Sequence, residues 1–105
     1  MLMADSHEDE RSKRDGLTDT QLASLGRVLA QPRRVQMLRE IAASEEPVSY
    51  IKLRQTHHVS SATFSHHIKQ LRTAGLIDVV RKGKCASVIL QRNVLRAYVN
   101  RLSTI

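Results

Sequence analysis

Apolar residues recur at helical spacing from residue 22 onward. Leu22, Leu25 and Leu29 fall on one face of a helix. The residues before them carry a capping box, in which Thr18 is the N-cap and Gln21 stands at the third helical position. The pattern predicts a first helix that starts directly after Thr18 and has one leucine-lined face.

A second helix is predicted to start at Pro32, because proline suits the first helical position, where a missing N–H costs nothing. The polar run 44–47 ends this helix. Its expected buried stripe consists of Val35, Leu38, Ile41 and Ala42.

Two helices joined by a tight turn are predicted next. Ser49 is expected to cap a short third helix that carries Leu53, and residues 57–59 form the turn. Ser60 then caps the fourth helix, which Gly75 ends in a left-handed conformation.

The fourth helix has two chemically different faces. Phe64, Ile68 and Leu71 follow one another at i, i+4 and i+7, which predicts a narrow buried stripe. The opposite face has no acid and no large apolar group, and it consists of Ala62, Ser65, His66, Lys69 and Thr73. Such a face is suited to a polar or anionic partner.

The last part of the chain predicts a β-hairpin followed by a helix. Residues 76–80 and 87–90 read as strands, and the Gly-centred, cationic residues 81–84 as the turn between them. Asn93 is expected to cap the final helix, whose apolar side consists of Leu95, Tyr98, Val99 and Leu102. The predicted fold class is mainly α with a small β-hairpin, in the order α-α-α-α-β-β-α.

Charge divides the chain into two parts. Residues 1–16 contain five acids and three bases without a period, and we expect a disordered tail there. Residues 17–105 contain 14 bases and five acids and form the single predicted domain. A compact basic domain is typical of proteins that bind polyanions. Aromatic residues make up only 3%, with no Trp, which disfavours stacking on single-stranded nucleic acid.

Composition also indicates the compartment. The single cysteine, Cys85, rules out an intrachain disulfide framework. No apolar run approaches the ~18 residues of a membrane span, and the N-terminus lacks the apolar core of a signal peptide. We therefore expect a cytoplasmic protein associated with the nucleoid.

Three segments of the chain resemble the ArsR/SmtB-type family of winged helix regulators. Residues 29–35 read Leu-Ala-Gln-Pro-Arg-Arg-Val, like the start of the family's second helix. Residues 60–76 contain Ser-His-His-Ile-Lys and resemble its recognition helix, and residues 81–84, Arg-Lys-Gly-Lys, stand at the place of its wing tip. The resemblance implies a winged helix-turn-helix homodimer that represses transcription and leaves DNA when an inducer, often a metal ion, binds.

This interpretation assigns two sets of residues. A helix fits the major groove and reads base edges with its N-terminal half, and a basic hairpin beside it contacts the backbone or minor groove. The expected DNA-binding residues are Ser60, Ser61, Ala62, Thr63, Ser65, His66, Lys69, Arg81, Lys82 and Lys84. The dimer is expected to pair through the terminal helices, at Leu22, Leu25, Leu29, Leu95, Tyr98 and Leu102.

The sequence departs from the family at its metal sites. Ser49, Ile51 and Arg54 stand where a familiar site has cysteines around the third helix, and residues 93–105 lack the Asp, His and Glu of a second site type. We therefore expect no metal or other cofactor. A small-molecule effector is still compatible with the sequence. His57 also departs, since the family usually has an apolar side chain there.

The remaining histidines favour no metal site either. Adjacent histidines on a helix point ~100° apart and rarely chelate one ion together, which applies to His66 and His67. His67 lies at the edge of the apolar stripe, so we expect it to be packed and hydrogen-bonded.

Two alternative functions remain beside DNA binding. The cations of residues 81–84 favour the Cys85 thiolate, which would suit a redox-responsive regulator, although a half-buried strand residue is the preferred interpretation. A winged-helix protein-interaction module is the other alternative. An enzyme is not expected, because no nucleophile motif or phosphate loop is present.

Overall fold

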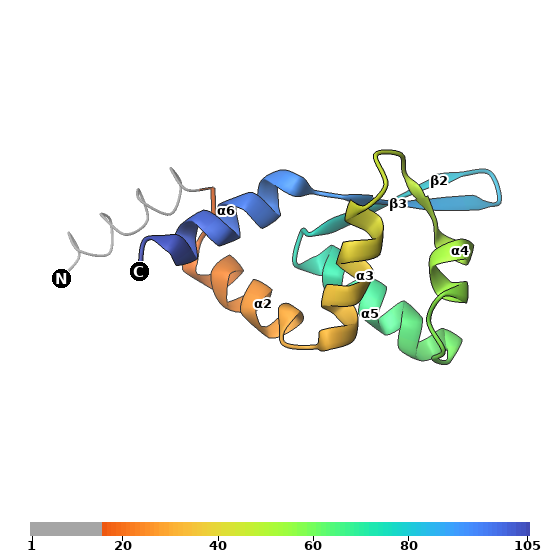
Figure 1. The fold of residues 1–105 in the computed structure, drawn as a ribbon, viewed down its shortest axis with the longest axis horizontal. Coiled ribbons are helices and arrows are strands. Elements are labelled where there is room, and N and C mark those ends of the chain that lie inside the picture. Colours follow the sequence, from red (N-terminus) through yellow and green to blue (C-terminus); the bar gives the residue numbers. More distant parts are fainter. Residues whose placement is uncertain (1–15) are drawn as a thin grey trace.

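The computed structural model describes residues 16–105, so the predicted tail lies almost entirely outside the described residues. Figure 1 shows helices α2 and α6 side by side at one end and the β-hairpin projecting at the other. The elements are α2 (Asp19–Leu29), α3 (Pro32–Ala42), β1 (Val48–Ser49), α4 (Tyr50–Gln55), α5 (Ser61–Thr73), β2 (Ile77–Lys82), β3 (Cys85–Leu90) and α6 (Arg92–Ser103).

Local capping starts three of the helices where the sequence predicts. The Gln21 backbone N–H donates to Thr18 Oγ1 at 3.1 Å, and the Thr18 N–H donates to Gln21 Oε1 at 2.8 Å, which completes the capping box. Ser49 caps α4 and Ser60 caps α5, each through its side-chain oxygen. Gly75, with φ +81°, ends α5 in the predicted left-handed conformation.

The sheet has three antiparallel strands in the order β1-β3-β2. Strand β1 pairs Val48 with Val88, and this short strand was not predicted. The hairpin is longer than predicted, because Arg81 and Lys82 belong to β2 and only Gly83 and Lys84 form the turn. Gly83 has φ +61°, which suits the first central residue of a two-residue hairpin loop.

One hydrophobic core joins the helices to the sheet. Phe64, Ile68 and Leu71 of α5 are buried in it, as predicted. The other buried apolar residues are Leu17, Leu25, Val28, Met37, Leu38, Ile41, Leu53, Leu76, Ile77 and Val88. Among residues 16–105, no helix is long and apolar enough to cross a membrane.

Two predictions about helix faces and ends were wrong. Val35 and Ala42 are only half-buried, because Arg34 and Met37 take the inner positions of α3. Asn93 does not cap α6. The helix starts after Gln91, whose backbone N–H is held by Leu76 O at 2.8 Å, so that tertiary pairing sets the helix start.

Candidate nucleic-acid interface

Helices α4 and α5 and the turn between them form a helix-turn-helix. The buried stripe of α5 fixes the rotation of this helix, so its polar face points outward. All ten predicted DNA-binding residues are exposed: Ser60, Ser61, Ala62, Thr63, Ser65, His66, Lys69, Arg81, Lys82 and Lys84. They lie on α5 and on the hairpin of β2 and β3.

The serine hydroxyls of this face have partners within the protein. Tyr50 OH and Ser65 Oγ are hydrogen-bonded at 3.2 Å, and the Arg54 guanidinium donates to Ser61 Oγ. Ser60 Oγ accepts from the Thr63 backbone N–H as the helix cap. These contacts fix the hydroxyls in place, and they bring Tyr50 and Arg54, which the sequence analysis missed, to the edge of the face.

The hairpin carries its cations on opposite faces. Successive residues of a strand alternate between the faces of a sheet. Arg81 shares its face with Val79 and lines a groove beside α5. Lys82 points the other way and lies with its cross-strand partner Cys85 beside a separate hollow of about 290 Å³. The two neighbouring cations therefore face different surroundings.

The groove between α5 and β2 is cationic. Its volume is about 560 Å³, and it is lined by Tyr50, Ser65, Ile68, Lys69, Arg72, Thr73, Val79 and Arg81. Three of these residues are basic and none is acidic. Arg72 was missed by the sequence analysis, although it follows Lys69 by three residues and therefore shares its side of the helix. The arrangement suits a chain of phosphates that passes between helix and hairpin.

A buried histidine supports the helix-turn-helix from inside. Arg33 Nη1 lies 3.1 Å from His57 Nδ1, and His57 Nε2 lies 2.5 Å from Glu40 Oε2. Because a guanidinium only donates, Nδ1 must accept and Nε2 must carry the proton. The ring therefore bridges a cation and a carboxylate. This pairing explains how a histidine occupies a buried position next to Phe64.

His67 is hydrogen-bonded, as the sequence predicts. Arg34 Nε donates to its Nδ1 at 3.1 Å. Within residues 16–105, no three His, Cys, Asp or Glu side chains gather in a way that would hold a metal ion.

Cys85 departs from the preferred interpretation of a half-buried strand residue, since it is exposed. It is the first residue of β3, next to the turn, where the partner strand covers little of its side chain.

One predicted dimer residue needs correction. Leu25 has no exposed surface, because it belongs to the core of the protomer, and it offers nothing to a partner. Leu22, Leu29, Leu95 and Tyr98 are half-buried. On α6, Leu102 is 43% exposed and Val99 is 54% exposed. A partly uncovered apolar strip thus runs along α2 and α6.

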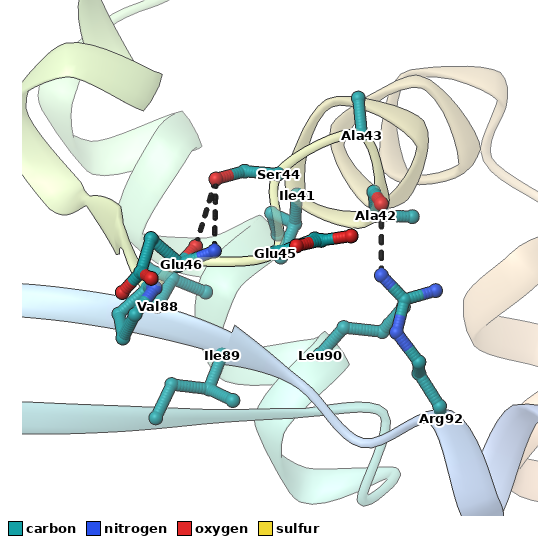
Figure 2. A pocket seen from close by; sticks show the side chains of 11 residues that line it. Ile41, Ala42, Ala43, Ser44, Glu45, Glu46, Val88, Ile89, Leu90 and Arg92 are labelled. Atoms are coloured by element: carbon teal, nitrogen blue, oxygen red, sulfur yellow. Dashed lines mark hydrogen bonds between the residues drawn. The ribbon is translucent and has the colours of Figure 1, made fainter.

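A hollow of about 630 Å³ lies between the end of α3 and the junction of β3 and α6 (Figure 2). Arg92 lines it and donates to Ala42 O at 2.8 Å, so it caps the C-terminus of α3. The loop beside it is held by Ser44, which bonds the backbone of Glu46. None of the predicted DNA-binding residues lines this hollow.

The comparisons with known proteins rest on structure. No protein-family model matches the sequence, and no curated protein is significantly similar to it. An ArsR-like transcriptional regulator from Rhodococcus sp. RHA1 superposes with a TM-score of 0.69 at 22% identity, over 81% of this chain and 78% of that one.

Two further solved structures have the same architecture. One is the homodimeric winged helix-turn-helix DNA-binding domain of Mb0332 from Mycobacterium bovis, a possible ArsR-family regulator (TM-score 0.66, 22% identity, 81% of this chain and 78% of that one). The other is HlyU from Vibrio cholerae N16961 (TM-score 0.62, 20% identity, 82% and 95%). The described part of this chain therefore has the winged helix-turn-helix fold of ArsR-family transcriptional regulators.

Proposed function

We propose that this protein is a sequence-specific transcription regulator of the ArsR type that binds double-stranded DNA as a homodimer and acts as a repressor. The observation that carries the proposal is the acid-free outer face of α5, which continues into the cationic groove beside β2. The fold of the structural neighbours supports it.

In this proposal the helix and the hairpin have different roles. The first half of α5 enters the major groove, where Ala62 and His66 are placed to meet base edges. Lys69, Arg72 and Arg81 line the groove beside it and pair with backbone phosphates. Tyr50 holds Ser65 in a fixed position at the same edge.

The apolar strip on α2 and α6 supports the dimer. Val99 and Leu102 are about half exposed in the protomer, and a second copy would cover them. Mb0332 is homodimeric with the same fold. A two-fold dimer presents two copies of α5 related by the same axis, so the operator is an inverted repeat.

Selection from a pool of random duplexes tests the proposal and identifies the operator sequence at the same time. We expect one enriched sequence, whose affinity falls steeply with salt because bound cations release counterions from DNA. Lys69→Ala is expected to weaken binding and to reduce the salt slope by about one. Arg39→Ala removes an exposed cation of α3 outside the groove and serves as the matched control. Absence of an enriched sequence, or equal effects of the two variants, would contradict the proposal.

Transcription with purified polymerase tests the sign of regulation. With the selected duplex placed over a promoter, we expect added protein to lower transcript yield. A rise in transcript yield would contradict repression.

A further inference from the structure

The last turn of α2 contains a carbonyl that its own helix does not satisfy. In an α-helix the carbonyl of residue i accepts from the N–H of residue i+4. For Val28 that residue is Pro32, which has no N–H. Arg34 supplies the missing donor, because its Nη1 lies 3.3 Å from Val28 O in a buried contact.

The same guanidinium also holds the recognition helix. Arg34 Nε donates to His67 Nδ1 at 3.1 Å, and Arg34 is only 8% exposed. One side chain of α3 therefore joins the end of α2 to the middle of α5. No other hydrogen bond between side chains of residues 16–105 connects α3 to α5.

This link depends on the protonation state of His67. Because Arg34 donates to Nδ1, that nitrogen must be unprotonated, and a neutral ring carries its proton on Nε2. A second proton would set an N–H against an N–H and add a cation beside the guanidinium. The link is therefore compatible with the neutral ring only.

The surroundings of His67 are cationic. Burial lowers the pKa of His67 below its ordinary 6.5, and Arg34, His66, Arg33 and His57 lower it further. Within residues 16–105, no carboxylate is hydrogen-bonded to His67, and Glu40 is bonded to His57 instead.

We propose that Arg34 and His67 form a protonation-sensitive link that positions the recognition helix α5 relative to α2 and thereby makes duplex binding weaken in acid. The proposal rests on the DNA-binding function proposed above. Arg34 and His67 act as positioning residues, since α2 belongs to the proposed dimer contact and α5 to the DNA contact. Breaking the link loosens the spacing between the two recognition helices of a dimer.

The sign follows from the two protonation states. The folded protein holds His67 neutral more strongly than the unfolded chain does, so the link contributes fully above pH 6.5. Its contribution is lost as the pH falls through the lower folded value. Positive charge gained on the exposed face of α5 would strengthen binding to a polyanion rather than weaken it. A loss of affinity in acid therefore points to the buried link.

A pH titration followed by heteronuclear NMR tests the link without DNA. In the wild type we expect the Arg34 Nε–H signal and the backbone signals of Val28 and Leu29 to shift with the titration of His67. His67→Asn keeps an acceptor near the position of Nδ1 but cannot titrate, and it should abolish these shifts. His58→Asn removes an exposed neighbouring histidine and should leave them unchanged. Val28 and Leu29 signals that do not respond, or that respond equally in His67→Asn, would overturn the proposal.

Affinity for the selected duplex completes the test. From about pH 7.5 to 5.5 we expect the wild type and His58→Asn to lose about five- to tenfold more affinity than His67→Asn. Equal losses in all three proteins would overturn the coupling to DNA. If no variant binds any duplex at pH 7.5, the proposed function fails instead, and the NMR titration still decides whether the link exists.

Discussion

Helices α5 and α6 are both amphipathic and have similar lengths, 13 and 12 residues, but they cover their apolar residues differently. In α5 the apolar stripe of Phe64, Ile68 and Leu71 is buried within the protomer. In α6 no residue is buried, and Val99 and Leu102 are about half exposed. The protomer therefore completes the packing of one helix and leaves that of the other open.

The two helices also differ in the chemistry of their outer faces. The outer face of α5 is polar and free of acids, which suits a polyanion. The open face of α6 is apolar, and burying it against another protein surface would be favourable. This contrast supports the proposals made above, in which α5 contacts DNA and α6 contacts a second copy of the chain.

The largest expected effect comes from charging the open face of α6. Val99→Glu combined with Leu102→Glu should give a monomer in light scattering, because two carboxylates would be buried in the dimer contact. Affinity for the selected duplex should fall about 100-fold or more, because separate monomers no longer bind the two half-sites of the operator together. Ile51→Glu, at a residue of α4 that is 63% exposed, is the control and should remain a dimer. If the double variant remained a dimer, the apolar face of α6 would not be the dimer contact.

The next largest effect is expected from removing cations on the two faces of the hairpin. Arg81→Ala removes a cation from the groove beside α5 and should weaken duplex binding about fivefold, with a smaller salt slope. Lys82→Ala changes the same charge on the opposite face and should cost less than about twofold. Filter binding at several salt concentrations measures both. Equal losses of affinity in the two variants would show that the groove does not bind the DNA backbone.

The third prediction concerns the contribution of buried His57 to the free energy of unfolding. His57→Ala leaves Arg33 and Glu40 without their common partner, and we expect it to lower the free energy of unfolding by about 2 kcal/mol. His58→Ala, at the exposed neighbouring position, should change it by less than about 0.5 kcal/mol. Denaturant unfolding compares the two. Similar values for both variants would mean that the polar contacts of His57 do not stabilise the helix-turn-helix.

The smallest effect concerns the start of α2. Thr18→Ala removes the side-chain acceptor of the capping box and should cost about 1 kcal/mol. Thermal unfolding measures it, with Thr20→Ala, an exposed residue in the first turn, as the control. A loss no greater than that of the control would show that the cap contributes nothing.

Local chemistry made most of the fold predictable. Thr18, Ser49 and Ser60 were identified as caps because each acts within three residues of its own position. The buried stripe of α5 followed from spacing alone. Strand β1 was missed because two residues carry no period, and Val48 is a strand residue only through pairing with Val88. Asn93 was misjudged because a contact to Leu76 fixes the start of α6.

The buried polar residues could be placed only from the tertiary structure. The exposure of the proposed DNA-binding residues on α5 follows from the rotation of this helix, which the sequence reveals. The burial of Arg34 does not, because its partners come from α2 and α5. One local signal was present, since Pro32 leaves Val28 without an N–H donor four residues later.

Footprinting on the selected duplex tests the central claim most directly. If a dimer reads DNA through two copies of α5, hydroxyl-radical cleavage will show two protected half-sites in an inverted repeat, with centres one helical turn of about 10 base pairs, or a small multiple, apart. The flanking backbone should be protected where the hairpins lie. A single unrepeated site, or weak protection without a fixed position, would contradict the account.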